Sequence, residues 1–205
     1  MTAERAREEN TPHTGGVDDI GMSILSLVAH NEEKYEEPVG KTRLHKTFFL
    51  MTEELPCFRS RLNYKPKNHG PYSDTLEKCM AYLIDRDMLD ERHESGYKKN
   101  LYITEHGRKL LGGALSNIGN DVIILLPQIN DFLNGMSHDE MLAYVDLKYP
   151  EMAKNSDKYH DLIKPNALIP VMGLIEKRKI TAQCGAELLG ITYTEMYKKL
   201  GERLE

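Results

Sequence analysis

The sequence predicts a mainly α-helical protein with a small β-wing, and three observations lead to this fold class. From residue 17 onward, apolar residues recur at three- and four-residue spacings, the pattern of amphipathic helices. Residues 89–94 and 100–104 suit two strands, and a glycine-containing loop joins them as in a β-hairpin. Ser and Thr residues stand where several helices should begin. Helix, helix, strand, helix and hairpin follow one another in residues 17–112, the order of a winged helix-turn-helix domain, and a helical C-terminal extension follows.

The elements before the hairpin are read from their apolar faces and from turn residues. Residues 17–35 and 41–55 should form two amphipathic helices, the second ended by Pro56. Residues 59–65 alternate loosely enough for a short strand. After the turn at Gly70 and Pro71, Ser73 should cap a helix over residues 73–88.

The remaining segments extend this domain on both sides. Residues 1–16 are polar with mixed charges, so we expect a disordered arm. Thr104 should cap a helix that runs to the end of the winged-helix domain at 112. Residues 113–167 then form a helical connection that Pro127 should kink or split, with an irregular linker over 149–170. Ser137 and Glu140 should form a capping box within it.

The helical connection carries a short heptad seam. Its apolar residues are spaced alternately three and four apart, which suits either a dimer interface or packing against the first helix of the same chain. The residues of this seam are Leu115, Ile118, Val122, Leu125, Ile129 and Phe132. A homodimer is expected because paired winged helices read half-sites about one DNA turn apart.

The last unit, residues 168–205, is predicted to be a helix-turn-helix-like pair of helices. A small residue, a turn glycine and two apolar residues stand at positions where that motif needs them: Ala186, Gly190, Met196 and Leu200. Thr192 and Glu195 form a capping box where the second helix should begin. The unit could contact DNA or could pack as a helical hairpin on the first domain.

The run GPYSDTLEKCMAYLIDRDMLDERHESGYKKNLYITEHGRKLL resembles winged-helix regulators of the PadR and MarR kind. Tyr102, Ile103, Thr104 and Gly107 match the end of their pattern, whereas Asp87 stands where those families usually carry glycine. The segments GKTRLHKTFFL and HGPYS resemble more narrowly the YwgA-like group of prokaryotic winged-helix proteins and the Panacea antitoxin domain. The first resemblance implies DNA binding, and the second implies a protein partner.

The charge distribution leaves both functions open. The net charge is −5, but residues 41–69 hold seven basic and two acidic residues, a local excess that can attract DNA. Residues 74–94, which include the expected recognition helix, hold seven acidic and three basic residues, which favours a protein-binding, antitoxin-like or adaptor module instead. The candidate DNA contacts are Lys41, Arg43, His45, Lys46, Lys65, Lys67, Tyr72, Ser73, Lys78, Lys98, Lys99, Thr192, Tyr193, Thr194, Tyr197, Lys198 and Lys199.

Other classes of protein find little support in the sequence. No catalytic motif and no metal-ligand spacing occurs among the eight histidines and three cysteines, so we expect no enzyme, metal or cofactor. Cys57, Cys79 and Cys184 are expected to be small buried or half-buried apolar residues. No apolar run is long enough to span a membrane and no signal-peptide core is present, which predicts a cytoplasmic protein. The leading hypothesis is a homodimeric prokaryotic transcriptional regulator that binds double-stranded DNA.

Overall fold

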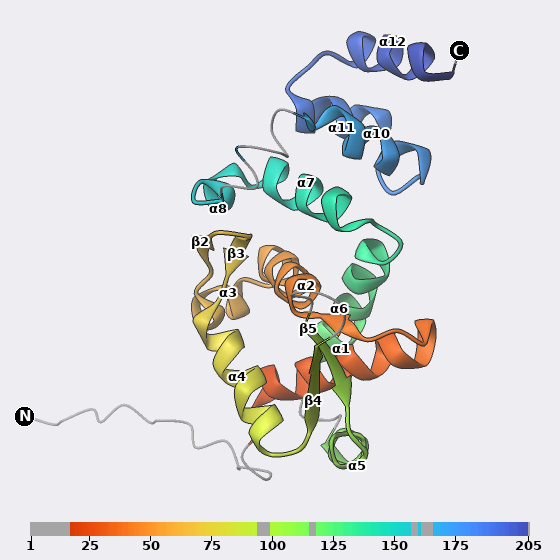
Figure 1. Ribbon diagram of the computed structural model, residues 1–205. Coiled ribbons are helices and arrows are strands. Elements are labelled where there is room, and N and C mark those ends of the chain that lie inside the picture. The colour runs from red at the N-terminus through yellow and green to blue at the C-terminus, as the bar shows by residue number, and fades with distance from the viewer. Residues whose placement is uncertain (1–16, 94–98, 115–117, 157–159, 161–165, 205) are drawn as a thin grey trace, which may run out of the picture.

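The computed structural model describes residues 17–93, 99–114, 118–156, 160 and 166–204 of the chain (Figure 1). It is mainly helical, with two small antiparallel sheets. The first half contains α1 (Asp19–Tyr35), β1 (Val39–Gly40), α2 (Lys41–Glu54), α3 (Pro56–Leu62), β2 (Lys65–Lys67), β3 (Gly70–Tyr72), α4 (Asp74–Asp85), β4 (Leu89–His93), β5 (Lys99–Ile103) and α5 (Glu105–Ala114). The second half contains α6 (Asn120–Leu133), α7 (His138–Lys148), α8 (Pro150–Ala153), α10 (Leu168–Glu176), α11 (Ala182–Leu189) and α12 (Tyr193–Leu204).

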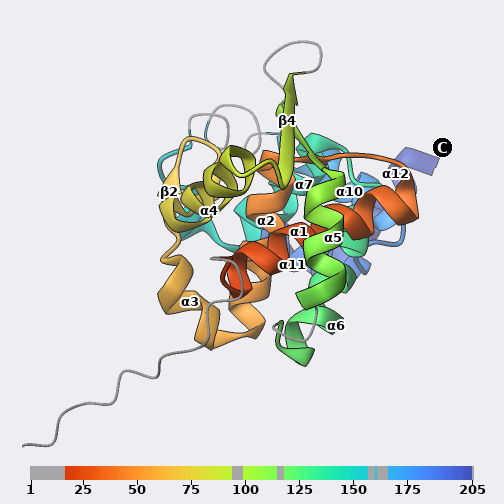
Figure 2. The same ribbon diagram turned by 90° about the horizontal axis from the view of Figure 1, so that it is seen from below.

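The three-stranded sheet has the order β1-β5-β4, with both pairs antiparallel. Leu89 pairs with Ile103 and Val39 with Leu101, so the predicted hairpin is confirmed and a two-residue strand joins it. β4 and β5 extend beyond the surrounding helices (Figure 2). The expected disordered arm at 1–16 and the loop at the hairpin tip lie outside the described residues.

The main core forms where α1, α2, α4 and α6 meet the three-stranded sheet. The side chains of Ile24, Leu44, Phe48, Leu76 and Leu101 are fully buried there, on the faces that the apolar spacing predicts. A second cluster, which includes Phe49, Val145 and Leu174, links α2 to α7 and α10. Figure 1 shows α7, α10, α11 and α12 stacked on the side of the molecule away from the sheet.

All four predicted helix caps are confirmed. Ser73 Oγ accepts a hydrogen bond from the amide of Leu76, and Thr104 Oγ1 accepts one from the amide of Gly107. Ser137 and Glu140 form a reciprocal capping box, and Thr192 forms another with Glu195. Each cap pairs backbone N–H groups that the first turn of a helix leaves without partners.

The prediction of a strand over 59–65 is wrong, because α3 occupies most of that range. Pro56 is at the first helical position of α3, where its fixed φ suits a helix and its missing N–H costs nothing. Pro127 lies inside α6, which runs on past it. α8 and the start of α10 fall within the segment expected to be a linker. Cys57 is exposed rather than buried, whereas Cys79 and Cys184 are half-buried as expected.

The heptad seam packs inside its own chain, so the dimer-interface prediction for these residues is corrected. Ile118 and Val122 are buried in the main core, and Leu125 and Ile129 pack against it. Phe132 packs in the second cluster, and Leu115 lies outside the described residues. Of the two alternatives that the sequence left open, packing against the chain's own helices is the one observed, because α6 contacts both α1 and α2.

Candidate functional site

The C-terminal unit has the geometry of two short helices joined by a tight turn. α11 ends at Gly190, whose backbone is left-handed with φ 65°, a conformation that glycine adopts without steric cost. Ala186 and Met196 face each other across the turn and are buried with Val171 of α10. A Cβ at Gly185 would lie 2.7 Å from Ile175 Cδ1, so α11 packs closely on α10. The core of this unit therefore uses two of the residues that the sequence singled out.

The outer face of α12 is open to solvent and carries aromatic and cationic side chains. Tyr193 and Tyr197 are 51% and 56% exposed, and their ring centroids lie 4.8 Å apart in an edge-on arrangement. The Lys198 side chain is 79% exposed, with its ammonium 3.9 Å from a Glu202 oxygen, and Lys199 is half-buried. Thr194 is exposed. Hydroxyls, ammonium groups and aromatic rings on one helix can contact phosphates and base edges.

The acidic residue in the first turn of α12 is used as a cap. The Glu195 carboxylate accepts hydrogen bonds from the amide and the hydroxyl of Thr192, at 2.8 and 2.7 Å. These two hydrogen bonds lower the pKa of Glu195 below its usual value. The negative charge is thereby held at the helix start, where the helix dipole stabilises it.

The basic residues of α2 that were predicted to contact DNA form ion pairs and hydrogen bonds within the chain. The Lys41 ammonium lies 2.6 Å from a Glu91 oxygen and 3.4 Å from a Glu77 oxygen. The half-buried Arg43 donates to Asn134 Oδ1 at 2.9 Å, and burial lowers the pKa of its guanidinium. Lys41 and Arg43 therefore make contacts that stabilise the fold, and neither is free to contact DNA without breaking them.

The expectation of phosphate contacts from His45 and Lys46 is corrected, because both are buried. Their side chains are 7% and 1% exposed. His45 Nε2 lies 3.2 Å from Glu77 Oε1, and its ring stacks on Tyr72 with centroids 4.8 Å apart. Neither group is open to a phosphate in this conformation.

The remaining candidates surround the start of α4 and the hairpin. Lys65 and Lys67 both pair with Asp74, and the Lys67 ammonium lies 3.5 Å from the centre of the Tyr72 ring. Ser73 is buried and donates its hydroxyl to the Leu62 carbonyl. Lys99 pairs with Glu91 at 2.9 Å, and Lys78 is exposed on α4. Lys98 lies outside the described residues.

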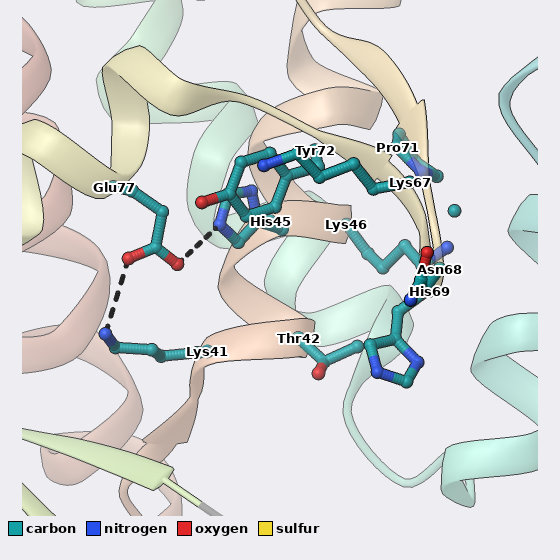
Figure 3. Close-up of a pocket in the computed structure, with 11 residues that line it drawn as sticks. Lys41, Thr42, His45, Lys46, Lys67, Asn68, His69, Pro71, Tyr72 and Glu77 are labelled. Atoms are coloured by element: carbon teal, nitrogen blue, oxygen red, sulfur yellow. Dashed lines mark hydrogen bonds and ion pairs between the residues drawn. The ribbon is translucent and has the colours of Figure 1, made fainter. Parts of the chain in front are cut away.

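A pocket of about 350 Å³ opens between α2, the turn from β2 to β3 and the start of α4. Lys41, Thr42, His45 and Lys46 line it from α2, because residues three and four apart adjoin on a helix. The other walls are formed by Lys67, Asn68, His69, Gly70, Pro71, Tyr72 and Glu77. In Figure 3, Thr42, Asn68 and His69 lie on the same side as Lys46, while Glu77 and Lys41 lie opposite.

A buried ion pair closes the pocket toward α7. Lys46 Nζ lies 2.5 Å from Asp146 Oδ1, and each side chain is 1% exposed. Burial lowers the pKa of the Lys46 ammonium, and the attraction of Asp146 opposes this shift. Gly70, with φ 84°, lies directly over the pair, where a Cβ would clash with both charged groups. The pair therefore joins α2 to α7 across 100 residues of sequence.

Sequence reasoning missed several members of this pocket and its wall: Thr42, Asn68, His69, Gly70, Glu77 and Asp146. Only the Gly70–Pro71 turn signal could have drawn attention to them. The pairing of Lys46 with Asp146 has no local signature, because it depends on how α7 packs against α2.

The described residues contain no group of three His, Cys, Asp or Glu side chains that could hold a metal ion. None of the helices in the described ranges is long and apolar enough to cross a membrane. No protein-family model matches the chain, and no curated protein is significantly similar to it in sequence.

Proposed function

We propose that the protein is a DNA-binding transcriptional regulator that contacts double-stranded DNA through α12 of its C-terminal unit. The observation that carries this proposal is the exposed Tyr193, Tyr197 and Lys198 face on the second helix of a helix-turn-helix-like pair. The start of α4 is the weaker alternative, because Ser73 is buried and Asp74 already holds two lysines there.

We further propose that residues 17–112 form a winged-helix domain with an insertion. The order α1, β1, α2, α4, β4, β5 and the sheet order β1-β5-β4 support it, with α3 and the β2–β3 pair inserted before α4. Asp87 adopts a left-handed backbone with φ 55°, which explains why glycine suits this position in the PadR-like and MarR-like pattern. In this reading the domain is the platform that positions the C-terminal unit.

A test of the proposed DNA surface removes its aromatic residues. Tyr193→Ala combined with Tyr197→Ala should weaken binding to a mixed pool of duplex DNA about tenfold or more, as expected when about 1.4 kcal/mol of contact energy is lost. Fluorescence anisotropy at low salt measures this change. Ile169→Ala, which truncates a 66% exposed residue on α10 outside the proposed DNA and dimer surfaces, is the matched control and should bind as the wild type does. Equal affinities of the wild type, the double variant and the control for DNA would show that α12 does not contact DNA.

A protein-binding module is the second candidate, and a different observation favours it. Ile123 and Ile124 are 38% and 60% exposed on α6, and most described basic residues of α2 and the hairpins are already paired. This function predicts that the product of a neighbouring gene co-purifies with the wild type and is lost with Ile124→Asp. If Ile124→Asp still retains that partner, the partner does not bind at Ile123 and Ile124.

A homodimer remains part of the regulator proposal, although the heptad seam does not supply its interface. The exposed pair Ile123 and Ile124 is the apolar surface on α6 that a second copy could cover. Light scattering after size exclusion should then give twice the chain mass of 23.5 kDa for the wild type and a monomer for Ile124→Asp. A wild-type protein with the mass of a monomer would contradict the proposed homodimer.

A further inference from the structure

The pocket between α2 and the β2–β3 turn is separate from the proposed DNA surface. Its residues come from α2, the β2–β3 turn and the start of α4, whereas the DNA surface is on α12. No step of DNA recognition by α12 uses it. Its volume of about 350 Å³ is that of a small-molecule site.

The lining residues include several hydrogen-bond donors and cations. Lys41, Lys46 and Lys67 contribute three ammonium groups, and Glu77 is the one carboxylate among the lining residues. Hydrogen bonds from His45 and then Lys41 lower the pKa of Glu77, so this carboxylate is already satisfied at one end of the pocket. At the other end, the nearest carboxylate is that of Asp146, which lies behind Lys46 and is paired with it.

The end of the pocket opposite Glu77 presents polar groups that the described chain leaves free. The side chains of Thr42, Asn68 and His69 make no hydrogen bond or ion pair in the described ranges, and they lie together beside Lys46 (Figure 3). His45, buried in the floor, has a second ring nitrogen, Nδ1, without a hydrogen-bond partner. A buried polar atom without a partner costs free energy, so His45 Nδ1 needs an explanation. Asn68 and His69 are exposed and Thr42 is half-buried, so these three side chains are accessible to a ligand.

The aromatic residues of the pocket do not offer a stacking surface. One face of the Tyr72 ring is covered by His45 and the Lys67 ammonium lies 3.5 Å from the ring centre. A ring of a ligand therefore cannot stack on Tyr72 unless His45 or Lys67 moves away. Hydrogen bonds in which one partner is ionised are about twice as strong as neutral ones.

We propose that this pocket binds a small oxyanion, a carboxylate or a phosphate group of a low-molecular-weight ligand, at the end formed by Thr42, Asn68 and His69. Thr42 and Asn68 donate hydrogen bonds to the anion, and His69 adds a ring N–H. Lys46 supplies positive charge behind them, although its ammonium stays paired with Asp146. Glycine at position 70 leaves room for that ion pair, because any side chain there would displace Lys46 and Asp146.

The test uses the full chain and two probes, inorganic phosphate and malonate, titrated at constant ionic strength with sodium chloride as the reference anion. Amide chemical shifts in a nitrogen-15 spectrum should move saturably for residues 41–46 and 67–72. The phosphate arm and the malonate arm separate the two sources of the oxyanion. Saturable shifts in either arm support the proposal, and the tighter probe gives the ligand class.

Two variants decide whether the shifts come from this pocket. Thr42→Val combined with His69→Ala should weaken the tighter probe about tenfold or more, the loss expected when charged hydrogen bonds are removed. His106→Ala, which removes an exposed histidine of α5 outside the pocket, should bind like the wild type. The proposal is overturned by linear shifts with both probes, or by equal affinities in the pocket variant and the control.

Discussion

The Lys46 ammonium and the Asp146 carboxylate form the most deeply buried charged contact described in the chain. Desolvation of two charges is costly, and their attraction offsets it only while both partners are present. The pair is therefore poor evidence for high stability. It does fix how α7 lies against α2, because a shifted helix would leave a charge in the core without its counter-charge.

Removal of one partner should therefore cost more than removal of both. Lys46→Met should lower the free energy of unfolding by about 3–5 kcal/mol, because the Asp146 carboxylate loses its counter-charge in the core. Lys46→Met combined with Asp146→Leu should be more stable than Lys46→Met alone. Urea denaturation measures the free energy of unfolding of both variants. A loss below about 1 kcal/mol in Lys46→Met, the value typical of an exposed pair, would contradict this description of the site.

Asp131 is a second residue whose charge contributes to the fold, and its effect depends on pH. It accepts hydrogen bonds from His30 Nε2 at 2.9 Å, Lys34 Nζ at 2.5 Å and Tyr35 Oη at 2.8 Å. Burial alone would raise the pKa of this carboxyl, but the three donors outweigh it and hold the pKa at about 2. These contacts join the end of α1 to α6.

A carboxyl with a lowered pKa in the folded state stabilises the protein above its ordinary pKa and loses that effect as the pH falls. Asp131→Asn should thus lower the free energy of unfolding by about 1 kcal/mol at pH 7, a modest value because solvent screens the group. The difference from the wild type should shrink between pH 4 and pH 2, where the carboxylate takes up its proton. Urea titrations across this range measure it, and a difference that does not change with pH would refute the assignment.

At the scale of elements, the turn between α11 and α12 gives a matched pair of substitutions. Gly190→Ala should destabilise the protein by about 1 kcal/mol, because φ 65° is unfavourable for a residue with a Cβ, although no atom would clash. Gly201→Ala, inside α12 and equally free of neighbours, should stabilise it by about 0.5–1 kcal/mol. Thermal unfolding measures the stability of each variant relative to the wild type. The same sign of change in both would contradict the assigned turn.

The sequence could predict the elements whose causes are local. The caps at Ser73, Thr104, Ser137 and Thr192 rest on contacts within one helical turn, and all four form. α3 was missed because PCFRSRL is too short to show a helical period, although Pro56 at its start suits a helix.

At the scale of the whole molecule, the sequence could not reveal which charged residues are free. The run of basic residues in 41–69 is real, but ion pairs with Asp74, Glu77, Glu91 and Asp146 take up most of its lysines. Three of these partners lie in the acidic segment after residue 73, so the two opposite runs of charge complement each other within the fold. The pairing depends on tertiary packing, which spacing along the chain does not show.

The central claim is that α12, and not the basic segment of the first domain, contacts DNA. The most direct measurement is the salt dependence of binding to duplex DNA, since each phosphate contact contributes about −0.9 to the slope of log K against log salt. Lys198→Ala combined with Lys199→Ala should reduce the size of the slope by about 2. Lys65→Ala combined with Lys67→Ala should leave it unchanged, because Asp74 pairs both lysines more closely than Glu202 pairs Lys198. A slope lost in the second variant and kept in the first, or no binding of the wild type even at low salt, would contradict the claim.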